Sequence, residues 1–287
     1  MRRTAGVLVA LALLVSGLVT SVAAPASAAP APTAVRAKTY VALGDSYAAG
    51  YGLPGPTDPA SVACARSSLA YPQLLRHFRN LRDVTFVACS GATTFDVQND
   101  QLSVLSEDTT TVTLTVGGND AGFASLVCLQ DASCDAAAIQ QRAAAALAAL
   151  AGGPAAIGAT GDPVVSLASL LAQIHARAPR ATIFVTGYPE LFGTAPTLYG
   201  TDTACPVPLG FRLLVNELAV QLNTVIRATA RAARQSGIKV VYVSVTKLFD
   251  GHGLCDTRAP LISTVLHPTV AGQLAYAAAL VRRGVAR

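Results

Sequence analysis

Tyr40-Val41-Ala42-Leu43-Gly44-Asp45-Ser46-Tyr47-Ala48-Ala49-Gly50 sets the architecture that we expect for this chain. A short apolar run ends in Gly-Asp-Ser, and small residues follow it. Such a run, bounded by turn-forming residues, is typical of a buried strand. Because glycine adopts backbone angles that are closed to other residues, Gly44 allows a sharp exit from the strand and leaves space beside the next side chains. The pattern therefore predicts a strand that delivers Ser46 to one edge of a sheet.

Three later segments also place small and polar residues where an apolar run ends or a helix begins. They are Cys89-Ser90-Gly91-Ala92-Thr93, Gly117-Gly118-Asn119-Asp120 and Leu266-His267-Pro268-Thr269. The first two follow apolar runs that are typical of strands, and the third opens the last helical segment. We expect all of them to lie near Ser46.

Apolar runs that suit strands alternate with segments that suit helices along the chain. The expected strands are 39–44, 84–88, 111–116, 181–186 and 239–243, and the expected helices are 69–78, 136–151, 164–178, 208–235 and 268–281. The strands lack a clear polar alternation, which indicates a parallel sheet that is covered on both faces. Right-handed crossovers then give a three-layer αβα sandwich. Sites in such folds lie at the carboxyl ends of the strands, where the segments above are expected.

The N-terminal 28 residues have the pattern of a secretory signal peptide. Met1-Arg2-Arg3-Thr4 is basic, residues 5–24 are apolar, and Pro25-Ala26-Ser27-Ala28 resembles a cleavage site. The alternative is a membrane anchor, because the apolar run is nearly long enough to span a bilayer. We expect cleavage, a disordered Pro- and Ala-rich lead-in at 29–37, and a single secreted domain over 38–287.

Six cysteines in an exported chain indicate disulfides. Fifteen pairings are possible, and only Cys128 and Cys134 are close enough in sequence to close a small loop. We expect sequential pairing: Cys64–Cys89, Cys128–Cys134 and Cys205–Cys255. A zinc site is disfavoured, because the chain has no Cys-x-x-Cys pair and no clustered Cys/His spacing.

Composition limits the range of partners. The formal charge is +5, but Lys and Arg are scattered without aromatic interleaving, which disfavours a nucleic-acid partner. Only 13% of the residues are charged, so we expect a large apolar interior or an apolar surface for an oily substrate. No apolar stretch after the N-terminal run is long enough to predict stable membrane insertion.

Ser46 needs a base before its hydroxyl can act as a nucleophile. The chain has four histidines. His77 and His175 fall within expected helices and are interpreted as structural residues, whereas His252 lies in a Gly-His-Gly loop. Pro268 favours the first position of a helix, which would fix His267 at the active edge of the sheet. His267 is therefore the favoured base, and His252 remains the alternative.

If Ser46 attacks the carbonyl carbon of an ester, the attack creates an oxyanion, which requires preorganised hydrogen-bond donors. The backbone N–H groups of Ser46 and Gly91 and the side-chain amide of Asn119 are the candidates. Each has a structural alternative: Gly91 suits a tight turn, and Asn119 suits a turn or a helix cap.

These residues resemble a known family. Gly44-Asp45-Ser46, Gly91, Gly117-x-Asn119 and His267 are similar, in order and spacing, to the four blocks of the SGNH (GDSL) hydrolases. The similarity extends over residues 40–280, and the Gly-Gly-Asn-Asp block and six cysteines look most like the secreted bacterial lipases and esterases. The resemblance implies acyl-ester hydrolysis, a flavodoxin-like fold with a five-stranded parallel sheet, and no metal or organic cofactor. It also implies the oxyanion roles above and supports the sequential disulfides.

One departure concerns the support of the histidine. Many members carry an Asp three residues before it, where this chain has Thr264. We therefore expect a Ser46–His267 dyad in which the backbone carbonyl of Thr264 accepts a hydrogen bond from Nδ1–H, with Asp256 as the alternative acid. Asp45 and Asp120 are expected to stabilise loops through local hydrogen bonds.

The sequence thus predicts a secreted, monomeric lipase or esterase. Phospholipase or carbohydrate acetylesterase activity on the same fold is the alternative, and a non-catalytic secreted binding protein is a more distant one. The absence of tryptophan disfavours a carbohydrate site, which usually needs aromatic platforms. A possible acyl pocket is formed by Tyr47, Tyr51, Phe123, Tyr188 and Leu254, although each of these also suits simple packing.

Overall fold

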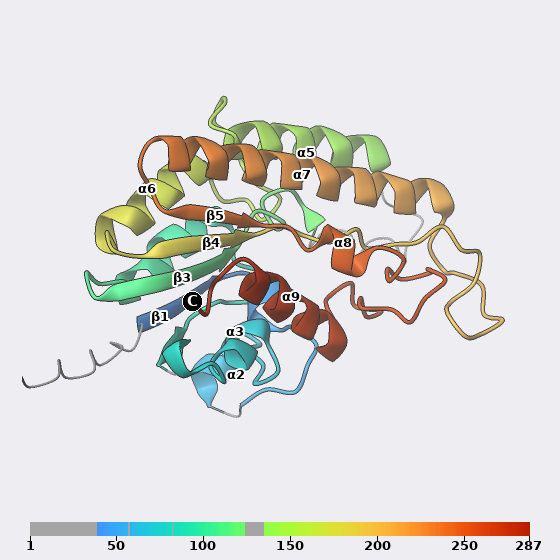
Figure 1. Ribbon diagram of the computed structural model, residues 1–287. Coiled ribbons are helices and arrows are strands. Elements are labelled where there is room, and N and C mark those ends of the chain that lie inside the picture. Colours follow the sequence, from blue (N-terminus) through green and yellow to red (C-terminus); the bar gives the residue numbers. More distant parts are fainter. Residues whose placement is uncertain (1–38, 57, 82, 124–134) are drawn as a thin grey trace, which may run out of the picture. The chain divides into compact units, whose positions relative to one another are not determined.

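A sheet of five parallel strands forms the centre of the described chain (Figure 1). The computed structural model describes residues 39–56, 58–81, 83–123 and 135–287. The strand order is β2-β1-β3-β4-β5, which confirms the flavodoxin-like parallel sheet. The strands are β1 (Thr39–Gly44), β2 (Val84–Phe86), β3 (Thr109–Thr115), β4 (Thr182–Thr186) and β5 (Val240–Val243).

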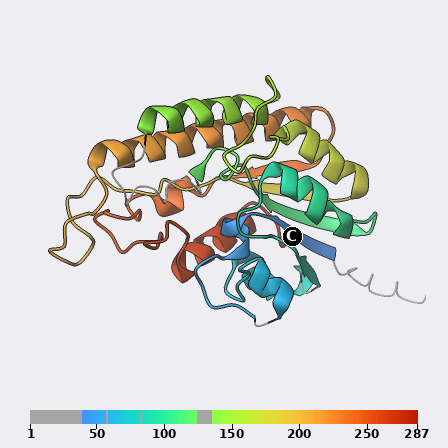
Figure 2. The ribbon, with the colours of Figure 1, turned by 180° about the vertical axis from the view of Figure 1, so that it is seen from behind.

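Helices cover both faces of this sheet and complete the three layers (Figures 1 and 2). One face carries α5 (Ala136–Leu150), α6 (Leu167–Arg177) and α7 (Leu209–Gln235). The opposite face carries α2 (Pro59–Ala63), α3 (Tyr71–Leu75) and α9 (Val270–Arg282). The remaining helical segments are α1 (Ser46–Ala49), η1 (Arg79–Leu81), α4 (Thr94–Asp96), η2 (Val97–Gln101), η3 (Leu102–Val104) and α8 (Thr246–Phe249).

Because helices cover both faces of the sheet, its strands show no alternation of apolar and polar residues. In β3, six of the seven residues are buried, including the threonines that would face solvent in a one-sided sheet. β-branched side chains suit such a pleated surface. The longest helix, α7, buries one stripe that includes Val215, Leu218, Leu222 and Ile226, at the spacing of a helix that packs along a sheet.

Local signals account for the ends of the long helices. The side chain of Asp135 accepts hydrogen bonds from the first turn of α5, and Ser166 and Thr269 do the same for α6 and α9. After α7, Gly237 takes a left-handed conformation, as expected for a residue that ends a helix.

The structure departs from the sequence predictions in short elements. The helix expected at 69–78 is limited to α3, and a turn and η1 follow it. Neither α2 nor α8 is among the predicted helices. Helices of four or five residues bury too few periodic side chains to leave a pattern in the sequence.

Two disulfides link loops at the active edge of the sheet. Cys64–Cys89 joins the end of α2 to the segment after β2, and Cys205–Cys255 joins the loop after β4 to the loop after α8. Both pairs confirm the sequential prediction. The third pair, Cys128–Cys134, lies outside the described residues.

Candidate active site

Ser46 and His267 meet at the carboxyl edge of the sheet. Ser46 is the first residue of α1, directly after β1, and its Oγ lies 2.7 Å from Nε2 of His267. The histidine stands just before α9, in a turn closed by a hydrogen bond from the Leu266 N–H to the Ser263 carbonyl. Leu266 has a positive φ of 59°, an uncommon conformation for a bulky residue. This turn brings together two residues that are 221 positions apart.

The surroundings of His267 favour a neutral base. Its Nδ1 lies 2.7 Å from the carbonyl oxygen of Val265, which can only accept a hydrogen bond. The ring proton therefore resides on Nδ1, and Nε2 presents its lone pair to the Ser46 hydroxyl. Burial lowers the pKa of His267 below its usual value, while the hydrogen bond to Val265 opposes this shift. The imidazole is thus unprotonated at neutral pH and can accept a proton.

The prediction that the Thr264 carbonyl accepts the hydrogen bond from His267 Nδ1–H is wrong by one residue. The acceptor is the carbonyl of Val265 and not that of Thr264. Because the backbone of Leu266 is in the left-handed conformation, the turn directs the carbonyl of Val265 toward the imidazole ring of His267.

Neither of the alternative residues joins the dyad. The Asp256 carboxylate accepts hydrogen bonds from the N–H groups of Gly253 and Thr257, within its own loop. Nδ1 of His252 contacts the carbonyl of Ala259. Both side chains therefore stabilise the loop that follows α8.

We expect Thr264→Ala and Asp256→Asn each to keep most of the activity. The backbone carbonyl at Val265 survives the first change, and the second alters a residue that holds only its own loop. Steady-state ester hydrolysis by both variants would check this. A loss of about 10,000-fold in Asp256→Asn, the scale seen when a triad acid is amidated, would instead indicate a true triad.

The candidate oxyanion donors come from three neighbouring strand ends. Ser46 follows β1, Gly91 follows β2 and Asn119 follows β3, and these strands are adjacent in the sheet. Gly91 has a φ of 87°, and a Cβ built there would have no neighbour within 4 Å, so its backbone borders open space. The Asn119 amide donates one hydrogen bond to the Ala92 carbonyl at 2.9 Å and has a second N–H to offer. The predicted segments therefore lie together, as expected for the carboxyl edge of a parallel sheet.

Two buried glutamines that the sequence analysis missed fix the backbone on either side of Ser46. Gln101 accepts from the Gly44 N–H at 2.8 Å and donates to the Gly44 carbonyl at 2.9 Å. Gln273, in α9, accepts from the Tyr71 N–H and donates to the Tyr47 carbonyl at 3.0 Å. A glutamine on the inward face of the last helix is a usable signal for Gln273, but nothing in the sequence distinguishes Gln101.

Two buried aspartates flank the site. Asp45 caps α1 by accepting from the Tyr47 N–H, and the Tyr188 hydroxyl donates to its other oxygen. Burial raises the pKa of Asp45 to about 7. Asp120 accepts from both the N–H and the hydroxyl of Thr94, and burial raises its pKa as well. The contact of Asp120 is therefore not local, since it joins the segments after β3 and β2.

The five residues proposed for an acyl pocket have different environments. Tyr51 is 40% exposed, and its ring centroid lies 4.8 Å from that of His267. The Tyr47 ring also lies against His267, but its hydroxyl donates to the Leu266 carbonyl. Tyr188 and Leu254 are buried, and Phe123 is half-buried. Of the five, Tyr51 is the residue that combines exposure with a contact to the dyad.

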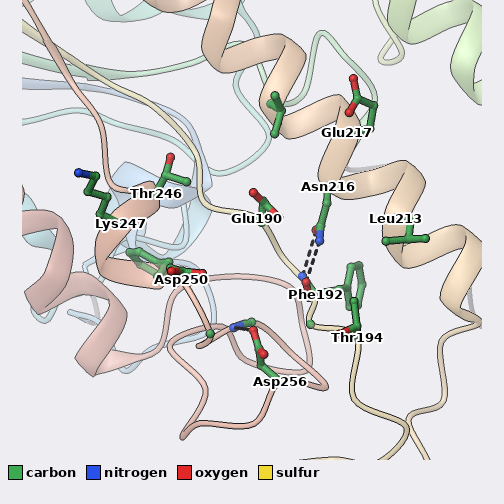
Figure 3. Close-up of a pocket in the computed structure, with 15 residues that line it drawn as sticks. Glu190, Phe192, Thr194, Leu213, Asn216, Glu217, Thr246, Lys247, Asp250 and Asp256 are labelled. Atoms are coloured by element: carbon green, nitrogen blue, oxygen red, sulfur yellow. Dashed lines mark hydrogen bonds between the residues drawn. The ribbon is translucent and has the colours of Figure 1, made fainter.

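A cavity of about 560 Å³ opens elsewhere, beside α7 and α8 (Figure 3). Its lining includes the acidic side chains Glu190, Glu217, Asp250 and Asp256, and the nearby carboxylates add to burial in raising the pKa of Glu190. None of the five proposed pocket residues lines it. Carboxylates on its wall make it unsuited to a fatty acyl chain.

Among the described residues, no group of three or more His, Cys, Asp or Glu side chains is arranged to hold a metal ion. Within the same residues, no helix is both long and apolar enough to cross a membrane.

Comparison with known proteins shows consistent similarity. Residues 42–275 match the model of the GDSL-like lipase/acylhydrolase family. A lipase of Streptomyces rimosus is 36% identical over 86% of this chain and 87% of its own length, and lipase 1 of Streptomyces coelicolor is 33% identical over 94% of each. The crystal structure of phospholipase A1 from Streptomyces albidoflavus is similar with a TM-score of 0.68 and 34% identity. That of the extracellular lipase from Streptomyces rimosus gives 0.67 and 31%, and in both cases the similarity covers 86% of this chain and 100% of the other.

Proposed function

Because this chain belongs to the GDSL-like lipase/acylhydrolase family, we propose that it hydrolyses carboxylic esters with Ser46 as the nucleophile and His267 as the base. The observation that carries this assignment is the 2.7 Å contact between Ser46 Oγ and His267 Nε2. A hydroxyl becomes a useful nucleophile when a positioned base takes its proton as it attacks.

The reaction would proceed in two halves. In the first, Ser46 Oγ attacks the ester carbonyl, and His267 takes the hydroxyl proton and passes it to the leaving alcohol. The N–H groups of Ser46 and Gly91 and the amide of Asn119 stabilise the oxyanion. In the second half, His267 activates water, which attacks the acyl-enzyme and releases the acid.

A dyad with a backbone acceptor has an energetic consequence. The carbonyl of Val265 fixes the tautomer and the orientation of the imidazole, as an aspartate does in a triad. It carries only a dipole, so it stabilises the imidazolium less than a full negative charge would. The oxyanion donors therefore supply a correspondingly larger part of the transition-state stabilisation.

Lipid esters are the favoured substrates. Both relatives described above are lipases, and a similar solved structure is a phospholipase A1, so phospholipid is the second candidate. A carbohydrate ester is less suited, because the chain has no tryptophan.

We further propose that the enzyme acts outside the cell as a secreted monomer, with residues 1–28 as its signal peptide and 38–287 as its single domain. The export pattern of the first residues and the disulfides Cys64–Cys89 and Cys205–Cys255 support this location.

A substrate panel tests the proposal. Hydrolysis would be measured for p-nitrophenyl esters from acetyl to palmitoyl and for a diacyl phospholipid, and a fluorophosphonate probe would be mapped by peptide mass spectrometry. We expect ester hydrolysis and labelling of Ser46. Absence of turnover on every ester, or labelling of a different serine, would contradict the proposal. A preference for acetylated carbohydrate over all acyl lipids would overturn the substrate class alone.

A further inference from the structure

The hydroxyl of Tyr188 links the nucleophile segment to the oxyanion segment. Tyr188 lies two residues beyond the end of β4. Its hydroxyl donates to Oδ2 of Asp45, the residue before Ser46, and accepts from the N–H of Gly118, the residue before Asn119, at 3.1 Å. One side chain from a fourth strand end thus contacts the segments that carry two of the three candidate oxyanion donors.

The direction of these hydrogen bonds is fixed by chemistry. The Gly118 N–H can only donate, so the Tyr188 oxygen accepts from it, and the hydroxyl proton is left to point to Oδ2 of the Asp45 carboxylate. The other oxygen of Asp45 accepts from the Tyr47 N–H at 2.9 Å. Tyr188 and Asp45 are each 1% exposed, so solvent does not compete for these groups. The link is therefore a single, defined arrangement.

Both the backbone and the ring of Tyr188 are held in place by neighbouring residues. Its backbone N–H donates to Oδ1 of Asn223 and its carbonyl accepts from Nδ2 of the same residue, both at 2.8 Å, so α7 clamps the main chain. Its ring packs edge-to-face on Tyr47 and Phe123, with centroids 5.1 and 6.2 Å apart. The position of the hydroxyl is thus set by the fold before any substrate binds.

Because Tyr188 holds Gly118, it also determines where the amide of the next residue, Asn119, lies. Gly118 packs directly against the Tyr188 ring, since a Cβ built at Gly118 would lie 3.2 Å from it. One N–H of the Asn119 amide is held by the carbonyl of Ala92, next to Gly91. Tyr188 links the Ser46 segment to the Asn119 segment, and Asn119 links its own segment to that of Gly91, where the Asp120–Thr94 contact adds a further link.

We propose that Tyr188 is a positioning residue for ester hydrolysis: its hydroxyl fixes the Asn119 amide relative to Ser46, so that the oxyanion donors stand at their working separation. This inference rests on the proposed function. Tyr188 acts through Asn119 and is buried, so it is removed from the group of residues expected to contact the acyl chain.

Tyr188→Phe keeps the ring and removes only the hydroxyl. Loss of a whole oxyanion donor costs about 100- to 1,000-fold in kcat, and a displaced donor costs less, so we expect kcat to fall about 10- to 100-fold. KM should stay within about 2-fold of the wild-type value, because the lost interaction matters mainly in the transition state. Tyr40→Phe is the matched control: it is a buried tyrosine whose hydroxyl bonds to Thr113, in the sheet interior. Its kcat should stay within about 2-fold of wild type.

A double variant separates positioning from general loosening. If Tyr188 acts through Asn119, its hydroxyl has nothing to position in an Asn119→Ala background, and the double variant should be no slower than Asn119→Ala alone. Asn223→Ala provides a second route in case Tyr188→Phe does not fold, since it frees the Tyr188 backbone and keeps the hydroxyl. It should lower kcat in the wild-type background and have no effect in the Asn119→Ala background.

Several results would overturn the inference. These are a kcat within 2-fold of wild type in Tyr188→Phe, an equal loss in Tyr40→Phe, or additive losses in the double variant. Ser46→Ala, assayed in parallel, distinguishes this failure from that of the proposed function. If Ser46→Ala is inactive while Tyr188→Phe is normal, only the positioning role fails; if turnover does not depend on Ser46, both proposals fail.

Discussion

Ser46→Ala is expected to lower kcat by about 10⁵- to 10⁶-fold, the scale observed when the nucleophile of a serine hydrolase is removed. The covalent route disappears with the hydroxyl, whereas the fold should persist. Alanine is smaller than serine, and α1 is capped by the side chain of Asp45 and not by that of Ser46. Turnover of a p-nitrophenyl ester and labelling by a fluorophosphonate probe would be measured together, and both should be lost.

Ser244→Ala is the matched control for this experiment. Ser244 also follows a strand, β5, but it is exposed, and its hydroxyl donates to that of Thr246. This variant should keep wild-type turnover and labelling. Persistent labelling of Ser46→Ala at another serine would reassign the nucleophile.

Asn119→Ala should reduce kcat by about 100- to 1,000-fold and change KM much less. Asn119 is 6% exposed, and a hydrogen bond to a developing charge is strongest where water is excluded. The variant also loses the contact with the Ala92 carbonyl, which should lower the free energy of unfolding by about 1 kcal/mol. Steady-state kinetics and thermal unfolding would measure the two effects separately.

Asn99→Ala removes a comparable amide. Its Nδ2 donates to the Phe95 carbonyl at 2.9 Å on an exposed surface, so this control should keep normal turnover. Near-normal turnover in Asn119→Ala as well would leave Asn119 with only the structural task of joining two loops.

The positions of the strands and of the site could be predicted from the sequence, because burial leaves a pattern of apolar residues. Apolar runs located all five strands, and the rule that sites lie at the carboxyl ends of parallel strands brought Ser46 and His267 together in advance of the structure. The short helices α2 and α8 leave no comparable pattern, because their place depends on the loops around them.

Finer features of the site depend on single dihedrals and distant contacts. The acceptor at His267 Nδ1 is Val265 and not Thr264 because of the left-handed conformation of Leu266, which its residue type does not predict. The sequence places Tyr188 among the residues of a possible acyl pocket. Its hydroxyl partners, Asp45 and Gly118, are 143 and 70 positions away, and no local pattern identifies them.

The support of His267 by a main-chain atom also bears on how this gene can evolve. A triad aspartate is lost through one missense mutation and becomes protonated in strong acid. The acceptor at position 265 is a backbone carbonyl, which every amino acid supplies and which does not titrate. Drift at positions 264 and 265 can therefore reshape the rim beside the histidine while the orienting atom stays the same, as long as the turn at Leu266 is retained.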